Sequence, residues 1–292
     1  MADTGKRVGQ ALRTLAHKAV SPVLRHIPRD REWLYPFFLA GNLVSEVEER
    51  EIPGLPPVLD GFTVAYASDV HFGPYFTSKQ AAALAARLAA FHADLVVLGG
   101  DYGDNHANSI RFFNSILPFP SGQRVLAVVG NHDYGLAGEP MDPLYSAMRE
   151  KNVVPLVNEA YILLKNGVSV AVLGPDDVKV GKPDYQALAS AARGAGFTLF
   201  IPHSPDALPD AEEAGLKYDL ALCGHTHGGQ ITLFGRSLHS SSRFGDMFRC
   251  GWYERGDARA LVSCGVGTSI LPMRWGTNAQ IHKVTLRAKA EG

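Results

Sequence analysis

Residues 216–230 read LKYDLALCGHTHGGQ, a short and mostly apolar run that closes at Gly224 and is followed at once by His225 and His227. A run of this length and composition is typical of a buried β-strand. The two histidines then leave the strand at its carboxyl end, the edge where open α/β sheets bind ligands. The neighbouring glycines leave room for a ligand to approach the backbone. A His-x-His pair alone also fits two residues that merely share one face of a strand.

Strand-like and helix-like segments alternate through most of the chain. Strands are expected over 62–68, 94–100, 124–130, 197–203, 218–224, 230–235, 259–265 and 279–287. Helices are expected over 78–92, 109–117, 141–151 (with Asp142 as N-cap) and after Pro205, and a hairpin over 161–174 with its turn at Asn166-Gly167. Residues 46–51 (EVEERE) and 52–61 (IPGLPPVLDG) look like an irregular approach segment. This order predicts a layered α/β sandwich with helices outside.

Size and composition narrow the class of protein. The chain has 292 residues, 46% of them hydrophobic, and a formal net charge of −1, which suits one large domain with an appendage and gives no reason to expect nucleic-acid binding. Three cysteines without Cys-x-x-Cys spacing argue against a disulfide framework and favour a reducing compartment. Cys223 fits a small buried side chain better than a thiol ligand. No run of about 18 apolar residues predicts a membrane-spanning helix.

The N-terminal extension, residues 1–51, is basic and aromatic. Residues 5–31 hold seven Lys or Arg against one Asp, and Val8, Leu12 and Leu15 begin a rough helical stripe that Pro22 interrupts. A basic amphipathic helix can lie on anionic lipid. A solvated helix packed on the domain, or a mobile tail, fits the same residues. We therefore expect a cytoplasmic protein, with peripheral attachment to the inner face of the cytoplasmic membrane as the open alternative.

The expected strands end in residues of one chemical kind. The donors among them are Asp69, His71, Asp101, Asn131, His203, His225 and His227. One such tip is an ordinary turn, but five in one chain are hard to explain by turns. Seven donors are too many for one tetrahedral zinc and fit two ions that share a bridging carboxylate. Mixed nitrogen and oxygen ligands suit Mn, Fe, Zn or Co, whereas magnesium would favour fewer imidazoles.

Two such ions suit hydrolysis at phosphorus. Held about 3.5–4 Å apart, they stabilise the attacking and leaving oxygens and turn a bridging water into a hydroxide nucleophile. His132 lies one residue past a donor, and Asp104 is placed to orient its ring. A histidine held by a carboxylate is a suitable general acid for the leaving oxygen.

The ordered motifs Asp-x-His, Gly-Asp-x-x-Asp, Gly-Asn-His-Asp, a lone His and Gly-His-x-His, all within residues 62–230, resemble the calcineurin-like metallophosphoesterases. The resemblance implies a four-layered α/β/β/α sandwich, here residues 52–292. It implies a first metal site of Asp69, His71, Asp101 and His227, and a second of Asp101, Asn131, His203 and His225, with Asp101 bridging. His132 matches the family's acid and Asp104 its carboxylate partner.

Two departures separate the chain from one branch of that family. The serine/threonine phosphatases place Arg after the second Asp and Glu at the end of the third motif, where this chain has Asn105 and Asp133. A phosphoprotein substrate is therefore not expected. The strings PHSPD (202–206), GHTHGGQ (224–230) and GTSILPMR (267–274) resemble the bacterial membrane-associated branch. That branch includes phosphodiesterases and pyrophosphatases that cleave UDP-diacylglucosamine, often behind a transmembrane anchor for which residues 5–31 would substitute.

The expected function is hydrolysis of a phosphodiester or pyrophosphate bond, with a lipid-linked substrate such as UDP-diacylglucosamine. A soluble nucleotide or nucleic-acid phosphodiesterase is the alternative, and a catalytically silent scaffold is disfavoured because every donor and His132 are present. Arg243 and Arg249 in the loop 235–256, together with Arg274, are expected to bind the anionic substrate. The same loop also fits a surface excursion whose aromatic residues cover the core. Metal identity, leaving group and oligomeric state stay open.

Overall fold

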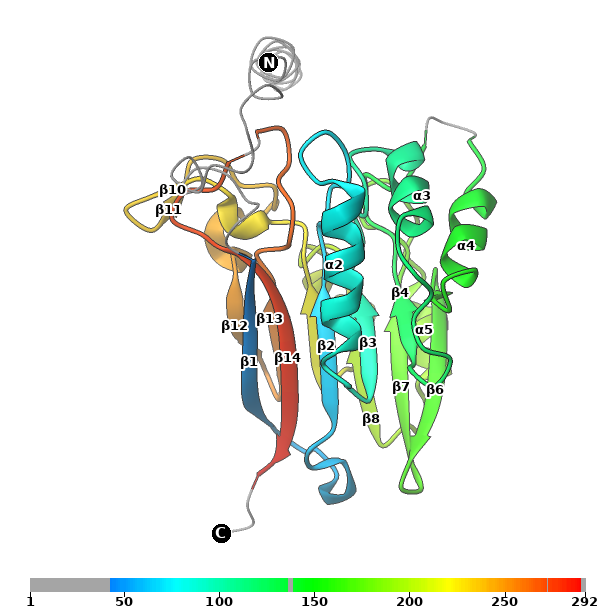
Figure 1. Ribbon diagram of the computed structural model, residues 1–292. Helices are drawn as coiled ribbons and strands as arrows, with labels where there is room; N and C mark the ends of the chain where they lie inside the picture. The colour runs from blue at the N-terminus through cyan, green and yellow to red at the C-terminus, as the bar shows by residue number, and fades with distance from the viewer. Residues whose placement is uncertain (1–42, 136–138, 272, 290–292) are drawn as a thin grey trace.

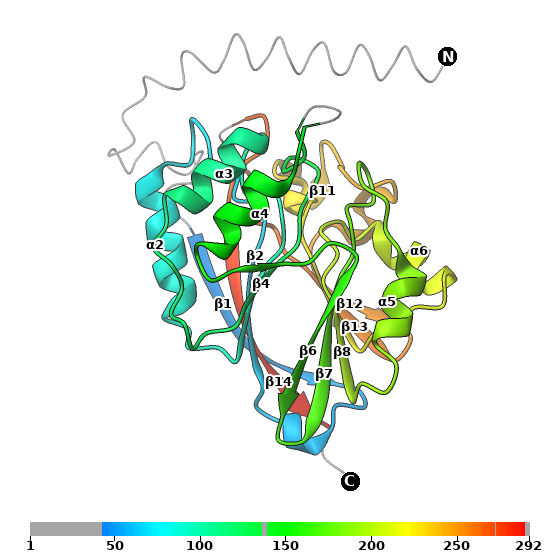
Figure 2. The same ribbon diagram turned by 90° about the vertical axis from the view of Figure 1, so that its right-hand side faces the viewer.

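The computed structural model describes residues 43–135, 139–271 and 273–289. Two six-stranded sheets pack face to face, and helices cover both outer faces (Figures 1 and 2). The first sheet has the order β1 (Leu43–Ile52), β14 (Ala279–Ala288), β2 (Thr63–Ala67), β3 (Leu95–Leu98), β4 (Val125–Ala127), β5 (Val154–Pro155). The second has the order β12 (Gly251–Arg255), β13 (Ala258–Val262), β9 (Leu220–Cys223), β8 (Phe197–Phe200), β7 (Val168–Gly174), β6 (Glu159–Lys165).

The helices divide between the two faces. Figure 2 shows α2 (Ser78–Ala89), α3 (His106–Asn114) and α4 (Asp142–Arg149) over the first sheet, and α5 (Tyr185–Ala191) and α6 (Ala207–Glu213) over the second. The short hairpin of β10 (Thr232–Leu233) and β11 (Arg236–Ser237) lies outside both sheets, and single 3₁₀ turns span Pro57–Leu59, His227–Gly229 and Gly245–Phe248. The predicted α/β/β/α sandwich is confirmed.

The core follows from the period-two alternation of the strands. In β2, Val64 and Tyr66 enter the apolar cluster between the sheets, whereas Ala65 and Ala67 enter the cluster under α2, α3 and α4. A third cluster, with Phe200 as a member, lies between the second sheet and α5 and α6. Because successive side chains of a strand point to opposite faces, a strand buried on both faces must be apolar throughout. This is why the central strands read as continuous hydrophobic runs.

The sequence-based boundaries fail at β1. Residues 46–51 were expected to be irregular, but β1 pairs in parallel with β14 over ten residues, so the predicted boundary between 51 and 52 falls inside a strand. This strand is an edge, where charged side chains are tolerated. Glu49 pairs with Arg287, and Glu48 accepts a hydrogen bond from Trp252 Nε1. Because β1 contains so many acidic residues, it shows no apolar periodicity by which the sequence could have predicted a strand. The predicted basic and aromatic stretches within 1–42 lie outside the described residues.

Smaller differences concern single elements. Asp142 is the first residue of α4 rather than its N-cap, which is Met141. The helix predicted over 109–117 is α3, which begins at His106 because the Asn105 side chain accepts the N–H of Asn108. The helix α5 and the strands β5 and β12 were not predicted. No helix among the described residues has the length and apolarity needed to cross a membrane.

The topology brings five strand ends together. Neighbours β2, β3 and β4 run parallel in the first sheet, as do β7, β8, β9 and β13 in the second. The two sheets meet at this edge, where the Asp69 carboxylate after β2 accepts the N–H of His225 after β9 at 2.9 Å. The expected donors, the first of which is Asp69 and the last His227, therefore converge at the carboxyl ends of both sheets. These strand ends lie at the top of Figure 1.

Candidate metal centre

One group of three donors forms where β2 and β9 end. Asp69, His71 and His227 are buried, and their donor atoms lie within 4.8 Å of one another. His71 Nε2 is 3.1 Å from His227 Nε2, which is 3.6 Å from Asp69 Oδ1. Two ligand atoms that bind the same ion at about 2.1 Å lie about 3.0–3.4 Å apart, depending on the coordination geometry. The 3.1 Å separation falls within this range and the 3.6 Å separation lies just above it, so the three donors are close enough to share one ion.

A second group of three donors lies beside the first. Asp101 follows β3, His203 follows β8 and His225 follows β9, and all three are buried. His203 Nε2 is 3.3 Å from Asp101 Oδ2 and 3.2 Å from His225 Nδ1. His203 Nδ1–H donates to the carbonyl of Gly99 at 2.7 Å. Because that carbonyl can only accept, the lone pair of a neutral His203 is on Nε2, facing the other two donors.

Asp101 connects the two groups. Its Oδ2 lies 3.3 Å from His203 Nε2 and 3.7 Å from His71 Nε2, which belong to different groups. Its Oδ1 accepts the main-chain N–H of His132 at 2.8 Å, which fixes the plane of the carboxylate. One oxygen therefore faces donors of both groups, as a bridging ligand would.

The backbone at the donors is strained. Asp69, His71, Asp101, His225 and His227 all have φ between 49° and 69°. This left-handed region is uncommon for residues with a Cβ and accumulates at functional sites. Each of these residues turns the chain sharply just after a strand, so that the side chain faces the strand-end edge. The cost of this geometry in folding free energy is offset by packing elsewhere, in the three apolar clusters.

Two glycines allow the chain to approach the carboxylates closely. A Cβ on Gly224 would lie 2.3 Å from Asp69 Oδ2, and one on Gly130 would lie 2.3 Å from Asp101 Oδ1. Both distances are far shorter than a van der Waals contact, so any side chain would displace a donor. The glycine before the His-x-His pair therefore makes room for Asp69.

Charge at the centre favours a bound cation. Burial lowers the pKa of His225 and of His227 well below the usual range, so both imidazoles are neutral, the form that binds metals. Burial would raise the pKa of Asp101, but the neighbouring imidazoles of His203 and His132 hold it well below its usual range. In turn, burial would lower the pKa of His203, but Asp101 raises it to about 10. The pair attracts positive charge, which a proton or a metal ion can supply.

Asn131 adds an orphaned acceptor. It follows Gly130, which packs against Asp101 and His203. Its Oδ1 is buried and has no hydrogen-bond partner within the described part of the chain. A buried acceptor without a partner is costly unless a ligand or water satisfies it. Together with the donor spacing, this oxygen fits a site for divalent cations.

His132 and Asp104 differ in detail from expectation. The carboxylate of Asp104 was expected to orient the His132 ring, but it lies 3.5 Å from His71 Nδ1 instead. His132 Nδ1–H donates to the main-chain carbonyl of Asp104 at 3.1 Å. The local turn thus holds the ring through the backbone, and Nε2 of His132 is the atom left to exchange a proton. The His132 ring centre is 4.8 Å from that of His71, beside the first donor group.

Asp133 is a positioning residue that the sequence analysis missed. Its carboxylate accepts the main-chain N–H groups of Asp101 (2.7 Å), Gly130 (2.8 Å) and Tyr102 (2.9 Å), and the hydroxyl of Ser109 (2.7 Å). The side chain is fully buried. It ties the turn after β3 to the turn after β4, and so sets the position of Asp101 relative to Asn131. The Gly-Asn-His-Asp motif contained this residue, but nothing in the motif shows that its last member bonds only to the protein.

The three arginines expected at the substrate do not form one site. Arg274 is only 6% exposed and donates to the carbonyls of His227, Cys264 and Gly267, so its guanidinium is engaged by the protein. Sequence alone could not show that this cation is buried under the His227 turn. The guanidinium of Arg243 is engaged by Asp210 and by the carbonyl of Asp206. The main-chain carbonyl of Arg249 accepts the hydroxyl of Thr226, which places the backbone of Arg249 beside the turn that carries His225 and His227.

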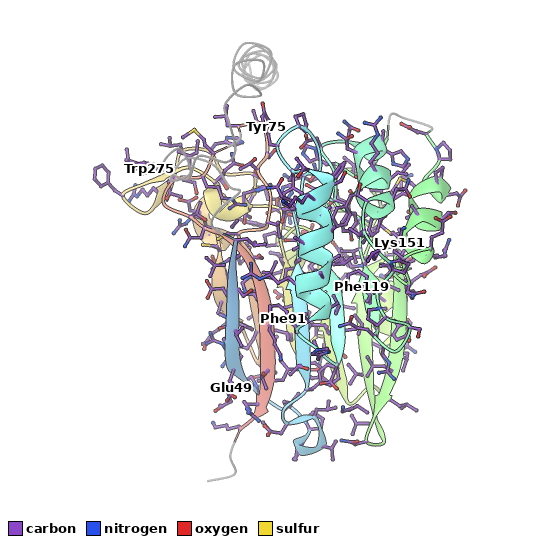
Figure 3. All side chains as sticks on the ribbon, in the orientation of Figure 1. Glu49, Tyr75, Phe91, Phe119, Lys151 and Trp275 are labelled. Carbon is purple, nitrogen blue, oxygen red and sulfur yellow. The ribbon has the colours of Figure 1, made fainter. Side chains whose placement is uncertain are left out.

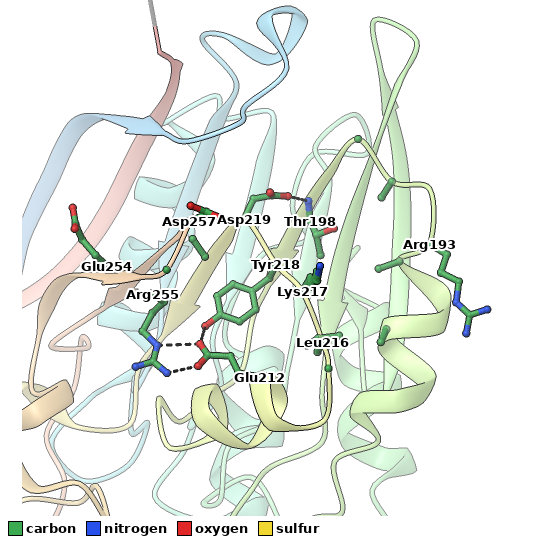
Figure 4. A pocket seen from close by; sticks show the side chains of 17 residues that line it. Arg193, Thr198, Glu212, Leu216, Lys217, Tyr218, Asp219, Glu254, Arg255 and Asp257 are labelled. Carbon is green, nitrogen blue, oxygen red and sulfur yellow. Dashed lines mark hydrogen bonds and ion pairs between the residues drawn. The ribbon is translucent and has the colours of Figure 1, made fainter.

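A groove of about 1000 Å³ lies elsewhere, at the amino ends of β8 and β9 (Figure 4). Several of its polar groups are engaged with one another: Glu212 accepts hydrogen bonds from Tyr218 and Arg255, and Asp219 accepts the N–H of Thr198. None of the seven donors lines it. The volume alone therefore does not make it a candidate catalytic site.

Several known proteins are similar to this chain. The model of the calcineurin-like phosphoesterase family matches residues 62–229. The chain is 28% identical over 263 residues to the uncharacterized metallophosphoesterase YkuE of Bacillus subtilis, covering 87% of this chain and 89% of that protein. It is 26% identical over 174 residues to the phosphodiesterase YaeI of Escherichia coli, covering 58% and 62%. A dimetal phosphatase from Danio rerio aligns with a TM-score of 0.41 at 12% identity, over 71% and 88% of the two chains.

Proposed function

The chain belongs to the calcineurin-like phosphoesterase family, whose model matches more than half of it, and from this premise we propose that it uses two divalent metal ions to hydrolyse a phosphodiester or pyrophosphate bond. The hydrolysis of phosphoester bonds is the activity of the family. The position of Asp101 Oδ2 between the two donor groups is the observation that carries the two-ion assignment.

The donors divide between two sites in this proposal. Asp69, His71 and His227 hold the first ion, His203, His225 and Asn131 hold the second, and Asp101 binds both. When bound, the ions supply Lewis-acid stabilisation of the phosphoryl oxygens and an activated water. Manganese, iron and zinc all suit a mixed nitrogen and oxygen set.

The remaining residues position groups or move a proton. His132 donates a proton from Nε2 to the leaving oxygen, while its Nδ1–H stays bonded to the carbonyl of Asp104. The Asp104 carboxylate, near Nδ1 of His71, orients that imidazole, as carboxylates beside metal-binding histidines commonly do. Asp133 holds the Asp101 turn in place through the backbone.

The substrate is proposed to be lipid-linked, such as UDP-diacylglucosamine. Support comes from the strings PHSPD, GHTHGGQ and GTSILPMR and from the basic character of residues 5–31, with which the protein would attach to the inner face of the cytoplasmic membrane. The relative YaeI is named a phosphodiesterase, which supports a diester rather than a monoester substrate.

One experiment tests metal and substrate together. Protein purified without added metal is analysed by mass spectrometry for bound elements. The same sample is then assayed with Mn²⁺, Fe²⁺ or Zn²⁺ on an aryl phosphodiester, an aryl phosphomonoester and UDP-diacylglucosamine. Two ions per chain and cleavage of the diester and the lipid would support the proposal. Preference for the monoester, or metal content near zero in the active protein, would contradict it. Activity on the diester without activity on the lipid would favour a soluble nucleotide-like substrate.

A further inference from the structure

Beside the metal centre lies a cluster of exposed hydrophobic side chains that we call the apolar rim: Leu233, Phe234, Leu238, Met247 and Trp275. Phe234 is 96% exposed, Leu238 68% and Met247 61%. Figure 1 places β10 and β11 at the same end of the molecule as the carboxyl ends of β2, β3 and β4, and Figure 3 shows Trp275 at that end and Glu49 at the other. A gathering of large exposed apolar side chains marks an interaction surface.

Hydrogen bonds from main-chain N–H groups, to two carbonyls and to the carboxylate of Asp246, hold the rim in one arrangement. The N–H of Thr232 donates to the carbonyl of Trp275 at 2.8 Å, and the N–H of Leu238 donates to Ile231 at 3.0 Å. The N–H of Ser237 donates to Asp246, next to Met247, at 2.9 Å. Three separate segments are thereby joined into one surface.

The rim is also joined to the metal centre. The 3₁₀ turn that begins with His227 leads within three residues into β10. The N–H of Trp275 donates to the carbonyl of Gln230 at 2.9 Å. Whatever contacts the rim therefore lies beside the proposed site of hydrolysis.

The backbone of Phe234 gives a second, independent indication. Phe234 and Gly235 form the two-residue turn between β10 and β11, with φ of 49° and 76°. A turn with two left-handed residues favours Asn, Asp or Gly at its first position, and an aromatic residue there is disfavoured. At 96% exposure, the ring buries almost nothing against the described residues. The left-handed backbone of Phe234 is therefore unfavourable, and contacts of its ring with the described residues do not offset that cost in folding free energy.

Charge and chain direction indicate the partner. Residues 231–250 contain three arginines (Arg236, Arg243, Arg249) and one acid (Asp246), a net charge of +2. The strand β1 begins at Leu43, which pairs with Ala279 of β14. Ala279 follows Trp275 by four residues in the sequence. The first described residue, Leu43, thus lies at the same end as the rim, and the basic stretch 5–31 precedes it in the sequence. An apolar tip flanked by arginines is complementary to an anionic lipid surface.

We propose that the apolar rim inserts into an anionic lipid bilayer, with Phe234 at the deepest point, and that the metal centre consequently opens toward the membrane surface. This deepens the proposed function, because it gives the site direct access to a lipid-linked phosphate. The contact with lipid does not itself depend on hydrolysis.

The test measures binding of the full chain to vesicles of phosphatidylglycerol and phosphatidylethanolamine by sedimentation at low salt, without substrate. Phe234→Asn removes the ring and suits the left-handed turn, so its melting temperature should not fall. Its partition onto the vesicles should fall at least about ten-fold, the worth of withdrawing one large apolar side chain from a bilayer. The matched control is Leu164→Asn in β6, at a position 70% exposed that pairs with Ser169 at the amino end of β7, which should bind as the unchanged protein does. The proposal would be overturned if Phe234→Asn bound the vesicles as well as the unchanged protein does. It would also be overturned if Phe234→Asn and Leu164→Asn lost binding to the same extent.

A second pair of variants locates the side chain directly. Phe234→Trp should show fluorescence quenching by brominated lipids beyond that of the unchanged protein, whereas Leu164→Trp should not. Absence of added quenching at position 234 would overturn the proposal and would indicate that a protein segment, such as the chain's own first 42 residues, covers the rim. Because no substrate is used, neither failure bears on the two-metal assignment, which the Asp101 variant tests separately.

Discussion

The main-chain N–H of Asp101 donates to the carboxylate of Asp133 at 2.7 Å. The residue proposed to bridge two ions is thus held in place by a carboxylate that belongs to neither group of metal donors. We expect Asp133→Asn to replace one carboxylate oxygen with an amide nitrogen, which cannot accept a hydrogen bond, and so to leave buried N–H groups unsatisfied. The free energy of unfolding should fall by about 2–3 kcal/mol. Urea unfolding of the metal-free protein measures this.

A matched control for that change is Asp219→Asn, since Asp219 is half-buried and accepts a single N–H, from Thr198. A loss of stability equal to that of Asp133→Asn would show that the several bonds of Asp133 have no special weight.

Asp101→Asn should lose bound metal and activity together, because the neutral side chain weakens both ions at once. Mass spectrometry of the purified variant measures the metal, and hydrolysis of an aryl phosphodiester measures turnover. Asp257→Asn, at an exposed position near the amino ends of the second sheet, should keep both. Full metal content with near-normal turnover in Asp101→Asn would contradict the two-metal assignment.

His132→Ala should separate proton transfer from metal binding. It should retain most of its metal, because the His132 side chain belongs to neither donor group, but lose about 10²–10⁴ in kcat on a poor leaving group. The loss should shrink for an activated aryl leaving group, which needs little protonation. Kinetics across a series of aryl diesters measures the difference. The same loss for good and poor leaving groups would be inconsistent with a proton donor.

Acid should destabilise the fold through His282, far from the proposed ligands in sequence. Burial lowers its pKa to about 4, although Glu48 nearby opposes this. The unfolded chain takes up the proton near pH 6.5 and the folded chain only near pH 4, so protonation favours unfolding as the pH falls through this window. Between pH 7 and 4.5 this group should remove about 2–3 kcal/mol from the free energy of unfolding.

His282→Gln should flatten that part of the pH dependence, as measured by urea unfolding at both pH values. His92→Gln, at an exposed position, should not. Identical pH dependence in the two variants would rule out His282 as the acid-sensitive group.

The sequence could predict that the expected donors meet, because each follows an apolar strand and parallel strands place their carboxyl ends at one edge. The structure brings six of the seven expected donors into two groups of three. The seventh, Asn131, follows Gly130, which packs against Asp101 and His203 of the second group. Where prediction failed, the deciding interactions involve the backbone or burial. The strand β1 is held by its ladder with β14, Asp133 by main-chain N–H groups, and Arg274 by carbonyls. No apolar periodicity reveals these contacts, and the motifs that contain Asp133 and Arg274 do not show which groups the two side chains bind.

Each proposed ion takes ligands from both sheets: Asp69 and His71 leave the first sheet and His227 the second, while Asp101 leaves the first and His203 and His225 the second. Occupied sites would therefore act as rivets across the open edge of the sandwich. Removal of the metal by a chelator would then do more than stop turnover. It would remove the links between the two sheets at this edge and so lower the resistance of this end of the molecule to heat and to proteases. For a protein of this construction, the supply of metal in its surroundings would set its lifetime as well as its rate.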